Sequence, residues 1–74
     1  MNIYYHPHFK QSYQKLPSFV KKKAELVENI FRTNPFNSKL KTHKLHGKLK
    51  NQWSFYIDIK YRILFEFDNK DVIF

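Results

Sequence analysis

The sequence predicts a single α+β domain over residues 1–74, with an N-terminal strand, an antiparallel helical hairpin and an antiparallel β-meander (order β-α-α-β-β-β). Three observations support this prediction. The length allows one domain at most. Apolar residues recur with a helical period between residues 17 and 34, and with a period of two from Trp53 onward. Eight Phe, five Tyr and one Trp supply the dense core that so small a domain needs.

The N-terminal half contains the strand candidate Ile3-Tyr4-Tyr5 and two helix candidates. Pro7 suits the first position of a helix, and Pro17 ends that helix and can open the next. Asn34-Pro35 marks the end of the second helix. The predicted apolar faces are Phe9, Tyr13 and Leu16 in the first helix, and Phe19, Val20, Ala24, Leu26, Val27, Ile30 and Phe31 in the second.

The C-terminal half changes period. Residues 35–51 have no sustained period and are predicted to form a basic loop, in which Gly47 marks a turn with positive φ. Three strands follow, separated by turns at Asp58-Ile59-Lys60 and Asp68-Asn69-Lys70, and the last strand begins at Asp71. One sheet face is apolar and should cover the helices. The other should be open to solvent or a ligand, and it carries Ser54, Tyr56, Arg62, Leu64 and Glu66.

The charge is strongly basic and unevenly distributed. Fourteen Lys and Arg against six Asp and Glu give a net charge of +8. Residues 1–24 and residues 39–50 each contain five Lys and no acid. Such blocks favour a polyanionic partner, either nucleic acid or an acidic protein, over a basic surface that only aids solubility. The second block contains Lys39, Lys41, Lys44, Lys48 and Lys50.

Several classes of protein do not fit the composition. The N-terminus "MNIYYHPHFKQ" lacks the basic and apolar regions of a signal peptide, and no apolar stretch has the length of a membrane span. The chain contains no Cys, which is compatible with a reducing compartment. These features predict a cytoplasmic protein that does not bind a membrane.

The candidate chemistry requires no cofactor. The chain has a single Gly, sparse acids, and no G-x-S-x-G motif, so neither a metal site nor a covalent triad is expected. RNA strand scission is compatible with the absence of a metal and of a covalent triad. The 2′-OH is the nucleophile, and the protein supplies only positioning, proton transfer and cations. His43 and His46 could transfer protons, or they could be ordinary surface histidines in a loop.

Arg62 and Tyr56 are the candidates within the sheet. The Arg62 guanidinium offers a planar fork suited to phosphate, although an ion pair with Glu66 or Asp58 explains it equally well. Tyr56 could stack on an RNA base, whereas Trp53 lies on the apolar face and should belong to the core.

The stretch "LKTHKLHGKLKNQWSFYIDIKYRILFEF" resembles the RelE/ParE superfamily of bacterial toxins, and most of all its YafQ-like mRNA interferases. The resemblance rests on the pattern Leu45-x-Gly47-x-Leu49-Lys50, followed by Trp53-Ser54 and Tyr61-Arg62-Ile63. The segments "PHFKQSYQKLP" and "NPFNSKLKTHKL" match this branch as well. The similarity therefore covers essentially the whole chain.

This resemblance implies the toxin of a type II toxin–antitoxin module, which binds a cognate antitoxin, enters the ribosome and cuts mRNA. By position, Arg62 matches the sheet arginine that contacts the scissile phosphate, and His43 matches a histidine that is functional in the YafQ-like branch. Ser54 and Tyr56 stand where RelE itself has lysines, so a lysine-based mechanism is not expected there. The RNA-binding candidates are Lys39, Lys41, Lys44, His46, Lys48, Lys50 and Tyr56.

The resemblance also implies a difference at the C-terminus. In similar proteins the last strand continues through a Gly-Thr-His type segment to a terminal aromatic residue, whereas this chain is expected to be truncated after "DVIF". We therefore expect this form to fold but to cleave mRNA weakly or not at all. The alternative is a non-enzymatic protein, either a ParE-like gyrase inhibitor or an inactive remnant that binds antitoxin.

Overall fold

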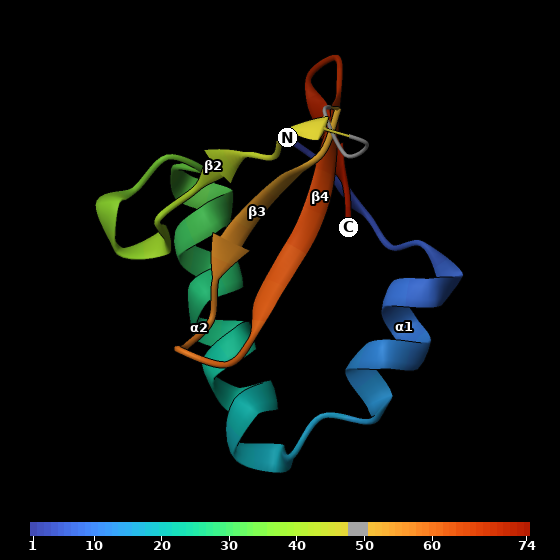
Figure 1. Ribbon diagram of the computed structural model, residues 1–74, viewed down its shortest axis with the longest axis vertical. Helices are drawn as coiled ribbons and strands as arrows, with labels where there is room; N and C mark the ends of the chain where they lie inside the picture. Colours follow the sequence, from blue (N-terminus) through green and yellow to red (C-terminus); the bar gives the residue numbers. More distant parts are fainter. Residues whose placement is uncertain (48–50) are drawn as a thin grey trace.

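The computed structural model describes residues 1–47 and 51–74 of the chain. A five-stranded sheet, in the order β1-β5-β4-β3-β2, lies beside two α-helices (Figure 1). β1 and β5 are parallel, and the other neighbouring pairs are antiparallel, which confirms the predicted α+β class and meander. In chain order the elements are β1 (Ile3–Tyr4), α1 (Pro7–Gln14), α2 (Ser18–Thr33), the 3-10 helix η1 (Ser38–Leu40), β2 (His43–Lys44), β3 (Trp53–Tyr56), β4 (Arg62–Asp68) and β5 (Asp71–Ile73).

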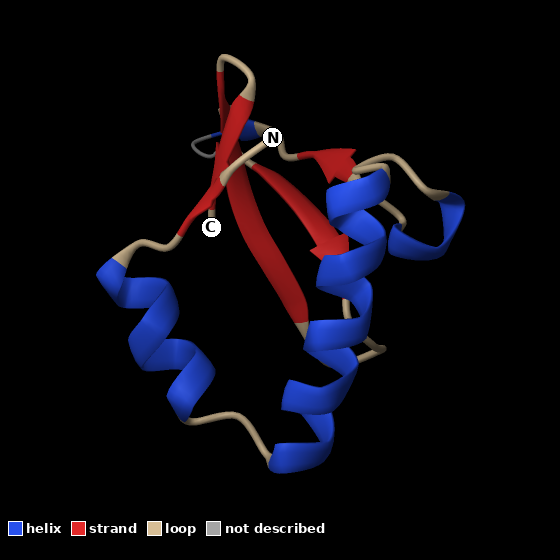
Figure 2. Ribbon diagram, turned by 180° about the vertical axis from the view of Figure 1, so that it is seen from behind, coloured by secondary structure: helices blue, strands red, loops and turns tan. Residues whose placement is uncertain are grey.

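The helix boundaries follow the prolines and caps in the sequence. Pro7 lies in the first turn of α1, Pro17 precedes α2, and Asn34 follows α2. The chain reverses at residues 15–17, as a hairpin requires, and the two helices diverge from this turn (Figure 2). Near the turn, Tyr13 Oη donates a hydrogen bond to Lys21 O at 3.4 Å. Within the described residues, no helix combines the length and the apolar character needed to cross a bilayer.

The buried face of α2 is narrower than the sequence predicts. Val20, Ala24 and Phe31 are buried, but Phe19 and Leu26 are 62% and 66% exposed. These two residues were expected to belong to a stripe two residues wide. The prediction is wrong for them because α2 buries only a narrow line of its surface in the core, and residues flanking that line face solvent.

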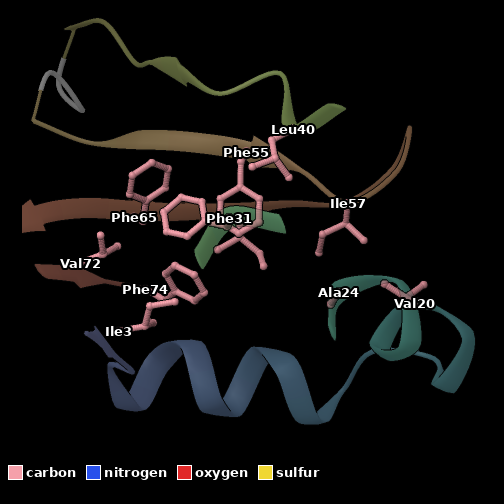
Figure 3. Packing of buried hydrophobic residues seen from close by; sticks show 11 residues of the cluster. Ile3, Val20, Ala24, Phe31, Leu40, Phe55, Ile57, Phe65, Val72 and Phe74 are labelled. Carbon is pink, nitrogen blue, oxygen red and sulfur yellow. The ribbon is translucent and has the colours of Figure 1, made fainter. Parts of the chain in front are cut away.

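Aromatic side chains form the centre of the core (Figure 3). The Phe31 ring of α2 stacks on Phe55 of β3 with centroids 4.6 Å apart, and meets Phe65 of β4 edge-on at 5.0 Å. Phe74 closes the cluster at 5.5 Å from Phe31. Truncating a buried Phe typically costs about 3–5 kcal/mol, so this cluster fixes α2 on the sheet.

The segment expected to be a loop contains two short elements. η1 and β2 lie within residues 35–51, and β2 pairs with β3 so that His43 is opposite Ser54. A strand of two residues is too short to produce a period in the sequence, so the prediction of an unbroken loop is wrong here. Gly47 has a φ of 74°, as predicted for a turn that needs positive φ.

The two sheet faces are largely as predicted, with two exceptions. Ser54 was expected on an open face, but it is only 1% exposed because the β2 strand and His43 cover it. Phe67 is in phase with Ile63 and Phe65 on the apolar face that should cover the helices, but it is 39% exposed. It contacts Phe36 and Trp53 instead, with ring centroids 6.0 Å and 5.4 Å away.

β4 has different neighbours along its length. Residues 62–65 pair with β3, and residues 66–68 pair with β5 on the opposite side. β5 is held in turn by β1, since Phe74 N donates to Tyr4 O at 2.9 Å and His6 N donates to Phe74 O at 3.1 Å. Along residues 62–65, the β4 edge that faces away from β3 has no strand partner among the described residues.

A hydrogen-bonded tyrosine ties the N-terminal segment to α2. Tyr5 Oη donates to Glu28 Oε1 at 2.6 Å and accepts from Arg32 Nη2 at 3.2 Å. Burial, followed by the hydrogen bond to Glu28, raises the pKa of Tyr5. The link holds β1 and the start of α1 beside α2, although neither short element buries much surface.

Candidate functional site: the polar face of the sheet

The sheet register brings three predicted site residues onto one face. His43 of β2 is opposite Ser54 of β3, and Tyr56 of β3 is opposite Arg62 of β4. Because side chains alternate along a strand, these four residues share the face turned away from α2. Two strand spacings and two residue steps separate His43 from Arg62, so their Cα atoms lie about 12 Å apart.

Local hydrogen bonds position the chain that leads into β2. Asn37 caps η1 by accepting from Lys39 N at 2.9 Å, and the fully buried Leu40 anchors this turn in the core. Lys41 then adopts a left-handed conformation with a φ of 50°. Thr42 Oγ1 donates to Pro35 O and closes the loop. The basic segment is therefore held in one conformation where it meets β3.

His43 is oriented by two contacts. Its Nδ1 lies 3.1 Å from Lys41 O, and its Nε2 lies 3.4 Å from Ser54 Oγ. A carbonyl oxygen can only accept, so Nδ1 must carry a proton and donate. In the neutral ring, Nε2 then holds the free lone pair and accepts from the Ser54 hydroxyl. Nε2 is therefore the atom of His43 that can take a proton from a substrate.

Two cations lie against the ring of Tyr56. Lys41 Nζ is 4.8 Å from the ring centroid, and Arg62 Cζ is 5.9 Å from it. Both distances fall within the range of cation–π attraction. Lys41 also accepts the His43 hydrogen bond through its carbonyl oxygen, so it connects the imidazole with the aromatic ring. The arrangement places positive charge on an accessible face beside a proton acceptor.

The turn before β4 leaves Arg62 available for a ligand. Asp58 Oδ1 accepts from Lys60 N at 2.8 Å and from Tyr61 N at 3.0 Å, and its Oδ2 is 4.0 Å from Lys23 Nζ. The predicted alternative, an ion pair between Arg62 and Asp58 or Glu66, does not occur among the described residues. Arg62 is exposed at the start of β4, where its guanidinium can meet an anion.

The other predicted RNA-binding residues lie outside this cluster. Lys44 is exposed, but alternation turns it to the opposite face from His43. Lys39 and His46 are exposed in the segments on either side of β2. Lys48 and Lys50 lie outside the described residues. Of the basic block, Lys41 is thus the lysine that contacts the candidate site.

Ser54 is the member of the site that the sequence did not identify as a candidate. The period of two predicted the sheet face on which Ser54 lies. Its contact with His43 depends on the pairing of β2 with β3, and no sequence pattern predicted that pairing. Among the described residues, no group of three or more His, Asp or Glu side chains is placed to hold a metal ion. The site offers an imidazole, a hydroxyl, a phenol and two cations.

Of the comparisons with known proteins, only the one with solved structures found matches, and these support the fold. No family model and no curated protein sequence matches the chain. YafQ from Escherichia coli BL21(DE3) superposes with a TM-score of 0.81 at 17% identity, covering 99% of this chain and 86% of that one. A YoeB/ParE toxin from Agrobacterium tumefaciens gives 0.79 at 16% identity, covering 99% and 91%.

A third similar structure contains a partner protein. It is the heterotetrameric YoeB–YefM toxin–antitoxin complex from Staphylococcus aureus, with a TM-score of 0.72 and 25% identity. The match covers 99% of this chain and 88% of that one. These likenesses agree with the resemblance found in the sequence and confirm the predicted fold.

Proposed function

We propose that this chain, which has the fold of the RelE/ParE toxin superfamily, is the toxin of a type II toxin–antitoxin module and a metal-independent endoribonuclease that cuts mRNA on the ribosome. The observation that carries the proposal is the cluster on the polar sheet face. There the Tyr56 ring contacts Lys41 and Arg62, and His43 Nε2, which lies 3.4 Å from Ser54 Oγ, is the proton acceptor. Cations beside a proton acceptor match the needs of RNA strand scission.

The proposed reaction uses the RNA as its own nucleophile. His43 Nε2 removes the proton from a 2′-OH, whose oxygen attacks the adjacent phosphorus. Arg62 stabilises the negative charge that develops on the phosphorane oxygens, and Lys41 holds the neighbouring backbone phosphate. The bond from phosphorus to the 5′-oxygen then breaks. The products are a 2′,3′-cyclic phosphate and a 5′-hydroxyl.

We expect the protein to cleave slowly. The leaving 5′-oxygen also needs a proton, and the described cluster contains one imidazole, which is already engaged at the 2′-OH. Water would have to protonate the leaving group, and the loss of one general acid typically costs a factor of about 10²–10⁴.

The proposed partners are a cognate antitoxin, the ribosome and mRNA, in the cytoplasm. The YoeB–YefM complex is a toxin bound to its antitoxin, and a net charge of +8 suits both RNA and an acidic protein. We expect the small acidic protein encoded beside this chain to form a stable complex with it. Co-expression and co-purification measure this directly, and failure to co-purify would contradict the toxin assignment.

Growth arrest on induction tests the proposed activity. We expect the unaltered chain to slow growth and to leave cyclic phosphate ends on cellular mRNA, whereas Arg62→Ala and His43→Gln abolish both effects. Lys22→Ala is the matched control, because Lys22 is an exposed cation of α2 outside the cluster. Arrest with intact mRNA and inhibited DNA supercoiling would instead support the alternative of a ParE-like gyrase inhibitor. Absence of both effects, with retained antitoxin binding, would support an inactive remnant.

A further inference from the structure

Three aromatic residues form an exposed cluster on the sheet face opposite the candidate site. Phe36 follows the end of α2, Trp53 begins β3, and Phe67 lies near the end of β4. Phe36 and Phe67 are 56% and 39% exposed, and Trp53 is half-buried. We call these three residues the aromatic platform. The proposed reaction does not use it, because Trp53 alternates with Ser54 and Tyr56 along β3 and faces the other way.

The rings of the aromatic platform support one another. The Trp53 ring meets Phe36 at 5.6 Å and Phe67 at 5.4 Å between centroids, edge-on in both cases. The Phe36 and Phe67 rings lie 6.0 Å apart, and their planes differ by only 23°. Phe36 N donates to Asn34 Oδ1 at 3.0 Å, which fixes the turn after α2. A surface held in this way loses little conformational freedom when a planar ligand stacks on it.

A lysine stands beside the aromatic platform. Lys44 of β2 is directly opposite Trp53 of β3, so both side chains share one sheet face. The Cβ atoms of residues paired in this way lie about 4.5–5.5 Å apart. Lys44 is exposed, and its long side chain can reach past the edge of the Trp53 ring. The same alternation that removes Lys44 from the candidate site therefore brings its charge to the aromatic platform.

The charges around the aromatic platform favour an anionic ligand with planar groups. Residues 29–57, which supply Phe36, Lys44 and Trp53, contain no Asp or Glu. Glu66 and Asp68 flank Phe67 along β4, but alternation turns them to the other sheet face. Single-stranded RNA offers both features that this surface can bind, since its bases stack on aromatic rings and its phosphates attract lysines.

The edge strand β2 connects the aromatic platform with the candidate site. β2 lies at one edge of the sheet, where His43 faces the candidate site and Lys44 faces the aromatic platform. An RNA strand that leaves the candidate site at His43 can pass around this edge to Lys44 without crossing the other strands. The base that reaches the aromatic platform is then a few nucleotides from the bond that is cut.

We propose that the aromatic platform stacks an unpaired base of the mRNA, a few nucleotides from the scissile phosphate, while Lys44 binds the phosphate of that nucleotide. This rests on the proposed function, since it takes mRNA as the ligand. The contact lies across the sheet from Arg62, so it raises the affinity for the strand without taking part in the chemistry. Two linked contacts on one strand strengthen its binding beyond either contact alone.

Fluorescence of Trp53, the single Trp of the chain, tests the inference. The probe is a single-stranded oligoadenylate of about ten nucleotides, with 2′-O-methyl groups that prevent cleavage. We expect it to quench the emission of the unaltered chain. Phe36→Leu keeps an apolar side chain but removes the ring, and it should weaken the affinity at least about fivefold. Phe19→Leu is the matched control and should change nothing, because Phe19 is an exposed ring of α2 outside the aromatic platform.

A lysine variant supplies the second measurement. Lys44 is exposed, so Lys44→Ala leaves the core undisturbed. We expect it to flatten the slope of log affinity against log salt concentration by about 0.7 for the same oligonucleotide. Lys22→Ala, which removes an exposed lysine of α2, should leave the slope unchanged. A slope that is the same in Lys44→Ala and in Lys22→Ala would overturn the inference.

The other outcomes separate this inference from the proposed function. Equal affinity of Phe36→Leu and Phe19→Leu for the oligonucleotide would overturn the inference, while growth arrest and antitoxin binding would still test the toxin assignment. If Phe36→Leu loses only the antitoxin, or only the ribosome, the aromatic platform binds that partner and the inference is wrong. Absence of any RNA binding by the unaltered chain would overturn the inference and the proposed ribonuclease together.

Discussion

At the scale of single residues, Ser54 is one of the two contacts that orient the His43 ring. Its hydroxyl is 3.4 Å from His43 Nε2, and its side chain is almost fully buried. Ser54→Ala leaves the β3 backbone unchanged but lets the imidazole rotate about its remaining contact with Lys41 O. We expect kcat for RNA cleavage to fall by about fivefold with an unchanged KM, the effect of losing one hydrogen bond of about 1 kcal/mol.

The conservative variant Ser54→Thr keeps the hydroxyl and provides the control for this prediction. It should restore most of the rate if the hydroxyl positions the ring, and it should restore none if only the volume of the side chain matters. A rate that stays at the level of the unaltered chain in both Ser54→Ala and His43→Gln would remove His43 from the mechanism.

At the scale of elements, the turn between β3 and β4 depends on one carboxylate. Asp58 accepts hydrogen bonds from Lys60 N and Tyr61 N and so sets the direction in which β4 leaves the turn with Arg62. Asp58→Ala removes both bonds. We expect the free energy of unfolding in urea to fall by about 1–3 kcal/mol, because each bond contributes about 0.5–1.5 kcal/mol.

Asp58→Asn separates these hydrogen bonds from the charge. The amide oxygen can still accept both N–H groups, whereas the contact with Lys23 at 4.0 Å loses its ionic character. Lys23 is exposed and Asp58 is partly buried, and a surface pair at this distance contributes about 0–1 kcal/mol, so we expect Asp58→Asn to remain close to the unaltered chain. Equal loss in both variants would mean that charge, and not turn geometry, stabilises this connection.

The elements also differ in how well the sequence predicts them. The helices and strands β3 and β4 were predictable because each repeats its period over several residues and is bounded by Pro, Asn or Asp. β2 was not predictable, since its two residues are held by pairing with β3 and by the left-handed Lys41. Arg62 could be named as a candidate from the period of β4, and His43 from its place in the basic block and from the family resemblance. The contacts of His43 and Lys41 required the three-dimensional structure.

At the scale of the whole molecule, the basic charge should govern the affinity for RNA. Each lysine that contacts a phosphate of single-stranded RNA contributes about 0.7 to the slope of log affinity against log salt concentration. Replacing Lys39, Lys41 and Lys44 by Ala should therefore flatten this slope by about 2 if all three contact RNA. Titrations of ribosomes or RNA at several salt concentrations measure the slope.

The control variant also loses three positive charges, but from lysines outside residues 39–50. Replacing Lys15, Lys22 and Lys70, which are exposed and lie outside residues 39–50, should lower the affinity slightly without the same change in slope. Single variants sharpen the test, because Lys41 contacts the Tyr56 ring whereas Lys44 lies on the opposite face. If the slope responds to Lys44→Ala but not to Lys41→Ala, RNA binds the sheet face opposite His43 and Tyr56, which would contradict the proposed site.

The parallel pairing of β1 with β5 has a consequence for the order in which the chain folds. Ile3 pairs with Val72, and Asn2 N donates to Asp71 Oδ1 at 2.9 Å across nearly the full length of the sequence. During synthesis the first strand therefore lacks its sheet neighbour until β5 has been made. The β3–β4 hairpin needs only local contacts and can form earlier. We therefore expect the polar face of β3 and β4 to form before β1 docks on β5.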